Sequence, residues 1–119
     1  MNVGKWGENK AEEYLENKGY SIQGRNVRTP YGEIDIIARK KGKYIFIEVK
    51  TRRSLQFGYP EDAITGKKRV KLIESAMAYI QDHPECGDEW QIDVISIQKI
   101  PSKRLNIIHF ENAVEEYEQ

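Results

Sequence analysis

The fold is decided by residues 31–50, which have the sequence YGEIDIIARKKGKYIFIEVK. Two apolar segments flank Lys41 and Gly42, and this arrangement predicts a β-hairpin with a tight turn at that pair. Side chains of a strand alternate between its two faces. We therefore expect two strands that each have one face suited to a core and one face that carries acids.

The alternation assigns the side chains of both strands to faces. On the first strand, Glu33 and Asp35 point one way, and Ile34 and Ile36 point the other. On the second strand, one face carries Tyr44, Phe46, Glu48 and Lys50, and the opposite face carries Ile45, Ile47 and Val49.

The turn also predicts which residues of the hairpin are opposed. A turn centred on Lys41 and Gly42 places Lys40 opposite Lys43. Counting outward from that pair, Asp35 faces Glu48 and Glu33 faces Lys50. Opposed like charges destabilise a sheet, so the Asp35–Glu48 pair predicts a nearby cation.

A divalent cation would offset this repulsion. Mg²⁺ is held in proteins by one or two carboxylates and keeps further positions for water and phosphate oxygens. An ammonium at Lys50 could then hold an attacking water or stabilise charge on a phosphorus-bound oxygen. The alternative is a half-buried strand with an ordinary solvated outer face, and the hairpin alone leaves both interpretations open.

The rest of the chain predicts a small α/β domain. The apolar spacing predicts a helix over residues 3–18 and another over 65–82, whereas residues 19–28, 89–97 and 105–110 are typical of strands. An acidic tail from about residue 111 is expected to be frayed. The order of elements favours a central mixed sheet flanked by helices.

Glu8 borders the apolar stripe of the first predicted helix. An inward carboxylate is costly unless it is paired or bound to metal. A paired or metal-binding glutamate and a plain surface glutamate are both open at this point.

The charge of the chain is zero overall but unevenly distributed. Residues 25–71 hold 13 Lys and Arg against 5 Asp and Glu, and the remaining residues hold 6 against 14. A basic segment of this kind is typical of a surface that binds polyanions such as nucleic acid. Ordinary solvated lysines would give the same count.

Composition narrows the class of protein further. The 119 residues suit one domain. They contain no apolar run of about 20 residues that could span a membrane. The amino terminus lacks a signal-peptide pattern, so we expect a cytoplasmic protein. A lone Cys86 with His83 and His109 does not form a zinc-ligand pattern.

The chain resembles the restriction-endonuclease-like nuclease superfamily, whose signature is an acid followed by Asp/Glu-x-Lys. The resemblance is carried by Glu8, by residues 32–35 (GEID) and by residues 48–52 (EVKTR). Within the superfamily the chain is similar to the YraN-type family of small bacterial proteins, and more distantly to the archaeal Holliday-junction resolvases. This resemblance implies the restriction-endonuclease-like α/β fold in a single endonuclease-like domain over residues 1–119.

Carried over position by position, the resemblance implies a metal site for Mg²⁺ or Mn²⁺. Its ligands would be Glu8, Asp35, Glu48 and the backbone carbonyl of Val49, with Lys50 as the catalytic lysine beside Asp35 and Glu48. Glu33 has no settled role in the superfamily, and two roles are open for it: orienting Lys50, its expected cross-strand partner, or forming an ion pair beside the site. Asp93 matches a position of the family outside the signature, and we expect a structural role for it. Contacts with nucleic-acid phosphates are our inference for the basic residues Arg52, Arg53, Lys67, Lys68 and Lys71.

The leading hypothesis is therefore a metal-dependent endonuclease that acts on structured or branched DNA in repair or recombination. One rival is a non-catalytic nucleic-acid-binding module of a larger DNA-processing complex. A second rival is a structural interaction protein whose acids form a satisfied surface network. Whether the chain acts as a homodimer or with a repair or recombination partner protein is left open, because fold analogy does not select substrate or partner.

Overall fold

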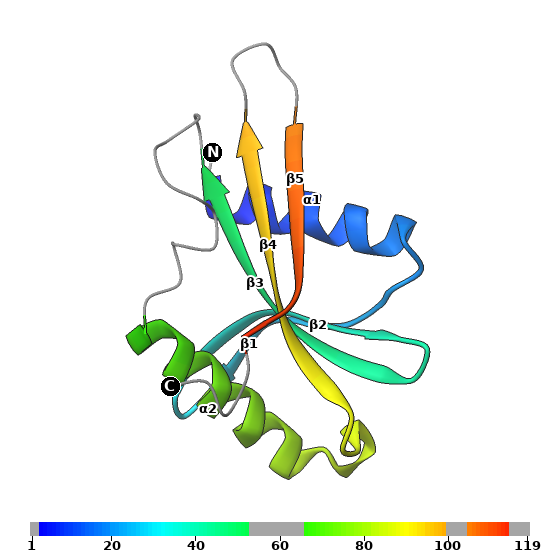
Figure 1. Ribbon diagram of the computed structural model, residues 1–119, viewed down its shortest axis with the longest axis vertical. Helices are drawn as coiled ribbons and strands as arrows, with labels where there is room; N and C mark the ends of the chain where they lie inside the picture. The colour runs from blue at the N-terminus through cyan, green and yellow to red at the C-terminus, as the bar shows by residue number, and fades with distance from the viewer. Residues whose placement is uncertain (1–2, 53–65, 100–104, 115–119) are drawn as a thin grey trace.

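The computed structural model describes residues 3–52, 66–99 and 105–114, and it has the α/β class that the sequence predicts (Figure 1). It contains two α-helices, α1 (Val3–Asn17) and α2 (Gly66–Asp82), and a short 3₁₀ helix, η2 (Pro84–Cys86). Five strands form one sheet: β1 (Ser21–Thr29), β2 (Gly32–Lys40), β3 (Lys43–Arg52), β4 (Trp90–Lys99) and β5 (Leu105–Val114).

The sheet is mixed and its strands follow chain order, β1-β2-β3-β4-β5. All neighbours are antiparallel except β3 and β4, which are parallel. Parallel neighbours need a long crossover connection, and α2 lies in the segment that joins them. This crossover brings α2 over the sheet, on the face opposite α1 (Figure 1).

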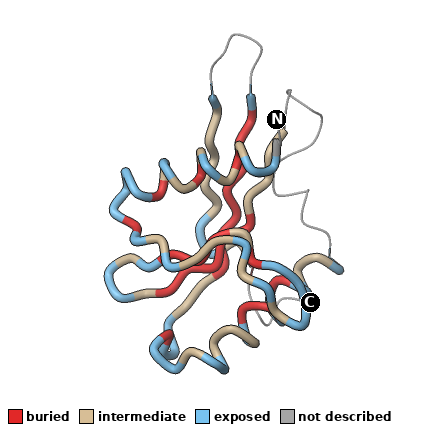
Figure 2. Tube along the Cα trace, turned by 180° about the vertical axis from the view of Figure 1, so that it is seen from behind, coloured by how far each residue is buried: buried red, intermediate tan, exposed pale blue. Residues whose placement is uncertain are grey.

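Each helix covers its own apolar core, and the buried residues follow the middle of the sheet (Figure 2). Beneath α2, Tyr44 and Phe46 pack with Leu72. Beneath α1, Ile45 and Ile47 pack with Leu15. The expected alternation of side chains along β3 is confirmed. Both faces of β3 are buried along residues 44–47, so this part of the strand does not have the solvated outer face that was the alternative.

The predicted hairpin turn and its register are confirmed near the turn. Lys41 and Gly42 have positive φ angles of 52° and 80°, as a tight two-residue hairpin turn requires. Backbone pairing of β2 with β3 runs outward from Lys40 opposite Lys43 and ends at Ile36 opposite Ile47. The expected backbone pairs Asp35–Glu48 and Glu33–Lys50 do not form, because β2 and β3 separate beyond Ile36.

The separation of the strands also corrects the expected faces of β2. Ile34 belongs to the core under α2, whereas Ile36 belongs to the core under α1. Strict alternation would place both on one face. On the other side of β2, Asn26 has a positive φ of 49°, which interrupts the regular β1 strand at the same level. We attribute the change of face to this irregular segment.

The acidic tail begins later than expected. Residues 111–114 were expected to be frayed, but they continue β5 and end on the buried Val114. The backbone N–H of Asn112 donates to the buried Asp93 carboxylate at 2.8 Å, and this bond fixes the end of β5 against β4. Residues 115–119 lie outside the described residues.

Gly7 sets how closely α1 approaches β3. A Cβ atom on Gly7 would overlap Thr51 Oγ1 and would lie 3.0 Å from Thr51 Cβ. We therefore expect Gly7→Ala to destabilise the protein, because overpacking costs about 1–3 kcal/mol and exceeds the gain of up to about 1 kcal/mol from Ala in a helix. Urea denaturation measures this change.

The matched control is Gly66→Ala, since a Cβ atom at Gly66 meets nothing within 4 Å. This substitution should leave stability nearly unchanged. Equal unfolding midpoints for the two variants would contradict a close contact between α1 and β3.

Among the described residues, no helix is long and apolar enough to cross a membrane.

Candidate active site

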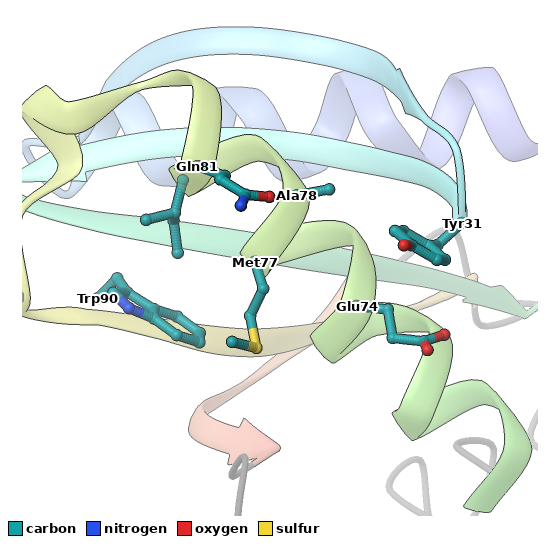
Figure 3. Close-up of a pocket in the computed structure, with 7 residues that line it drawn as sticks. Tyr31, Glu74, Met77, Ala78, Gln81 and Trp90 are labelled. Atoms are coloured by element: carbon teal, nitrogen blue, oxygen red, sulfur yellow. The ribbon is translucent and has the colours of Figure 1, made fainter.

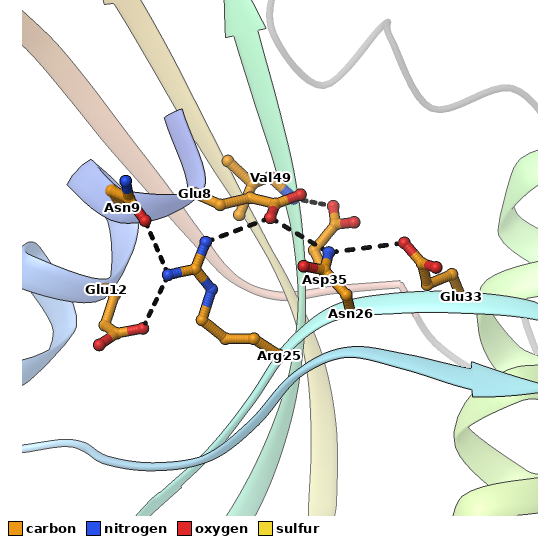
Figure 4. Close-up of polar contacts among 8 residues, drawn as sticks. All are labelled: Glu8, Asn9, Glu12, Arg25, Asn26, Glu33, Asp35 and Val49. Carbon is orange, nitrogen blue, oxygen red and sulfur yellow. Dashed lines mark hydrogen bonds and ion pairs between the residues drawn. The ribbon is translucent and has the colours of Figure 1, made fainter. Parts of the chain in front are cut away.

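The candidate site lies where β2 and β3 separate. Asp35 is the first residue of β2 beyond the part that pairs with β3. Its Oδ2 atom accepts a hydrogen bond of 2.8 Å from the backbone N–H of Val49 (Figure 4). The Asp35 side chain thus accepts the hydrogen bond that a backbone carbonyl of β2 would otherwise accept from β3. This bond places the Asp35 carboxylate beside Glu48, although the two residues are not paired through their backbones.

Glu48 is buried and held by two lysines. It is only 7% exposed and points to the face of the sheet that α2 covers, as Phe46 does. Its Oε2 atom lies 3.4 Å from Lys50 Nζ and 3.1 Å from Lys68 Nζ. Lys50 follows Glu48 by two residues on β3, whereas Lys68 reaches it from the first turns of α2.

The surroundings of Asp35 and Lys50 change the pKa of both side chains. Burial raises the pKa of Asp35 to about 7, and the Glu48 charge adds to this rise. The bond from Val49 N–H opposes it, and the charge of Glu8 raises it further. Burial also lowers the pKa of Lys50, and its hydrogen bond with Lys68 acts in the same direction. A buried acid and a lysine with shifted pKa values are typical of functional sites.

Glu8 lies at the edge of this group and has its own partners. Its Oε1 atom accepts from Arg25 Nη2 at 3.3 Å and from Asn26 Nδ2 at 3.1 Å (Figure 4). Arg25 also contacts Glu12, at 3.2 Å. The expectation that Glu8 faces inward is supported, since its side chain is only 16% exposed.

Arg25 and Asn26 are residues that the sequence analysis missed. A signal for Arg25 was present, because Glu8 and Glu12 are four residues apart and share one face of α1. Two acids on one face favour a cation on the neighbouring element. Nothing in the sequence pattern indicates the bond from Asn26, which depends on its positive φ of 49° in β1.

Of the two roles open for Glu33, the structure shows an ion pair, and its partner is Arg28 and not Lys50. Glu33 pairs with Arg28 in the β1–β2 register, and its carboxylate lies 3.7 Å from Arg28 Nε and accepts from Asn26 at 3.5 Å. The separation of β2 from β3 takes Glu33 toward β1, and the expected cross-strand pair with Lys50 is replaced by these contacts. Glu33 therefore touches the site through Asn26.

The basic segment of the sequence is divided by the fold. Arg39, Lys40, Lys41 and Lys43 lie at the hairpin turn. Lys41 follows Asp35 by six positions along an extended strand, a span of about 20 Å. Only part of the predicted basic region therefore surrounds the site.

The remaining predicted phosphate contacts differ in position. Lys67 and Lys71 are exposed on α2, and Arg52 is the last residue of β3. Lys68 instead points to Glu48. Arg53 lies outside the described residues.

A polar row continues from the site along the α2 face of the sheet. Ser96 on β4 is in register with Lys50 on β3. Ser96 is fully buried, and its Oγ atom has no hydrogen-bond partner among the described residues. The next residue on this face, Gln98, accepts a 3.0 Å bond from Asn106.

The residues present fit a small, hard cation. No group of three or more His, Cys, Asp or Glu side chains in the described ranges is arranged to hold a metal ion. Asp35 and Glu48 nevertheless form an all-oxygen pair, and the Glu48 charge adds to the effect of burial in raising the pKa of Asp35. Mg²⁺ takes one or two carboxylates and fills its other positions with water and phosphate oxygens, so a pair of acids suffices.

Asp93 belongs to a separate, buried network on the α1 face. Its Oδ2 atom accepts from His109 Nε2 at 2.7 Å, and its Oδ1 atom accepts from Gln91 Nε2 at 2.7 Å. His109 Nδ1 lies 3.1 Å from the Tyr14 hydroxyl. The network therefore joins α1 to β4 and β5, which supports the structural role expected for Asp93.

A hollow beside α2 is less suited to catalysis. It lies between Tyr31 and Trp90, with Met77 at its centre (Figure 3). Of its described lining residues, only Glu74 is charged. It therefore lacks the paired acids and lysine found where β2 and β3 separate.

The fold and the site together define the class of the protein. It is an α/β domain in which the half-buried Asp35, the buried Glu48 and Lys50 meet where two strands separate. The chain belongs to the uncharacterised protein family UPF0102, whose model matches residues 7–97. This is the YraN-type family that its sequence resembles.

Curated relatives match over most of their length. A UPF0102 protein of Syntrophomonas wolfei is 42% identical over 111 residues, which cover 93% of this chain and 96% of the relative. One of Persephonella marina is 44% identical over 110 residues, covering 92% of this chain and 90% of the relative.

Two solved structures match this chain at low sequence identity and with low TM-scores. SfsA of Pyrococcus furiosus in complex with Ca²⁺ has a TM-score of 0.46 at 17% identity, over 91% of this chain and 64% of SfsA. An EndoMS–dsDNA complex has a TM-score of 0.39 at 19% identity, over 70% of this chain and 32% of EndoMS.

Proposed function

We propose that the protein is a Mg²⁺- or Mn²⁺-dependent endonuclease that hydrolyses phosphodiester bonds of structured or branched DNA. The observation that carries this proposal is the position of Asp35 beside the buried Glu48, with Lys50 Nζ 3.4 Å from Glu48. The branched character of the DNA rests on the resemblance to resolvases.

Each residue of the site has a role in this reaction. Asp35 and Glu48 would hold the metal, with the carbonyl of Val49, whose backbone is fixed by its bond to Asp35. Glu8 would act from the edge of the site. The bound metal would polarise a phosphodiester oxygen and lower the pKa of a water molecule.

Lys50 supplies the positive group beside the reacting bond. Its lowered pKa makes the loss of a proton easier than for a solvated lysine, and its charged form would stabilise negative charge on a phosphate oxygen. Arg52, Arg53, Lys67 and Lys71 would bind flanking phosphates, a contact that is independent of base sequence.

A non-catalytic nucleic-acid-binding module is the second candidate. It is favoured by the ion pairs of the free protein, in which Arg25 holds Glu8 and two lysines hold Glu48. These contacts give Glu8 and Glu48 cationic partners without a metal. Such a module would bind DNA with an affinity that falls steeply with salt and would not cleave it.

Cleavage of labelled four-way junction, flap, duplex and single-stranded DNA separates the two candidates. We expect nicking with Mg²⁺ or Mn²⁺, none with chelator, and a loss of at least about a thousandfold in Asp35→Asn, because a metal-binding oxygen becomes an amide. Asp82→Asn, at an exposed position on α2, should cleave like wild type. Salt-sensitive binding without nicking would favour the module, and nicking that persists in Asp35→Asn would contradict the proposed site.

A further inference from the structure

Lys68 does not occupy the position expected of a phosphate-binding lysine. Lys67 and Lys71, on the same helix, are exposed. Lys68 instead places its Nζ 3.1 Å from Glu48 Oε2. The same oxygen is 3.4 Å from Lys50 Nζ. One buried carboxylate oxygen therefore carries two ammonium groups from two different elements.

The charges of this cluster balance without a metal. Asp35 and Glu48 supply two carboxylates, and Lys50 and Lys68 supply two amines. A divalent cation added between the acids would leave excess positive charge in a buried place, which is costly. Lys50 lies on the same strand as Glu48, two residues further along β3, and its side chain is 21% exposed. The Lys68 side chain is 40% exposed, so its ammonium can be hydrated when it leaves Glu48.

We infer that Lys68 is the internal counter-cation of Glu48, which competes with the divalent metal for this carboxylate and is released from it when the metal binds. This inference rests on the proposed metal site and deepens it. Lys68 is a positioning residue in this scheme: it keeps Glu48 in place in the free protein. Once released, its ammonium is free to contact a phosphate of the bound nucleic acid.

The cost of this competition is set by electrostatics. Two unit charges about 4 Å apart attract each other several times more strongly at the effective dielectric constant of a protein surface than in bulk water. Solvent screening at the partly exposed Lys68 weakens this attraction, whereas the burial of Glu48 preserves part of it. Removal of the Lys68 charge should therefore tighten metal binding by about tenfold.

The test is calorimetric titration of chelator-treated protein with MnCl₂. Lys68→Gln should bind Mn²⁺ about tenfold more tightly than wild type, and Lys68→Met should show the same gain. Lys71→Gln is the matched control, because Lys71 is exposed on the same helix. It should bind Mn²⁺ within about twofold of wild type. A purely structural role for Lys68 would lower stability without raising metal affinity.

Three results would overturn the inference. Unchanged or weaker Mn²⁺ binding by both Lys68 variants overturns it; if Asp35→Asn also abolishes binding, the metal site itself stands. An equal gain in Lys71→Gln overturns it, because the effect is then one of general surface charge. Absence of Mn²⁺ binding in every protein overturns it too, and the DNA cleavage experiment then decides the proposed function separately.

Discussion

Asp35→Asn should make the metal-free protein more stable at pH 8, by about 2–4 kcal/mol. In the folded protein, burial and the Glu48 charge raise the pKa of Asp35 from 3.8 to about 7. An exposed aspartate in the unfolded chain has a pKa of about 3.9. The folded state thus binds this proton more tightly than the unfolded state does.

The sign of the pH dependence follows from this difference in proton affinity. The contribution of Asp35 to stability is most favourable below about pH 4, is lost as the pH rises to about 7, and is constant above that value. Asparagine cannot ionise, yet its oxygen can still accept the bond from Val49 N–H. The difference in stability between Asp35→Asn and wild type should therefore grow between pH 4 and 7.

Urea denaturation at several pH values in chelator measures this difference directly. Asp82→Asn at an exposed position is the control and should show no such growth. Addition of Mn²⁺ should stabilise wild type but not Asp35→Asn, because a ligand that binds only the folded state stabilises it. A constant difference across pH 4–8 would show that the Asp35 carboxylate is not crowded.

Asp93→Ala should lower the free energy of unfolding by about 3–5 kcal/mol, because it leaves buried donors without an acceptor. Three groups donate to the fully buried Asp93 carboxylate: His109 Nε2, Gln91 Nε2 and the backbone N–H of Asn112. A loss of this size is a large part of the total stability of a small domain. Thermal denaturation should show a melting temperature lowered by about 10–20 °C.

Asp93→Asn should retain most of this stability. The amide oxygen can replace Oδ1, and the amide N–H can donate to His109 Nε2 if the imidazole carries its proton on Nδ1, facing the Tyr14 hydroxyl. Asp88→Ala, at an exposed position, should have little effect. If Asp93→Asn were as unstable as Asp93→Ala, the negative charge itself would be required. If Asp93→Asn folded normally but lost DNA cleavage, a purely structural role would be contradicted.

The sequence by itself determined the hairpin, its register near the turn and the face of β3 on which Glu48 and Lys50 lie. Lys41 and Gly42 set the turn, and the turn set the register from Lys40–Lys43 outward. Alternation then placed Glu48 and Lys50 on one face of β3. These features are local, because they depend on backbone conformations of adjacent residues and on a side-chain period of about two.

The tertiary structure alone decided which partners these residues take. Because β2 separates from β3, Glu33 contacts Arg28 and Asn26. The same separation lets the Asp35 side chain accept a hydrogen bond from the Val49 backbone. The packing of α1 placed Glu8 against Arg25, and the crossover between β3 and β4 brought Lys68 to Glu48. Segments far apart in the chain meet in these contacts, and their meeting depends on the bending of the sheet and the placement of helices on its two faces. Local side-chain periodicity specifies which face a residue occupies, but it does not specify which distant element covers that face.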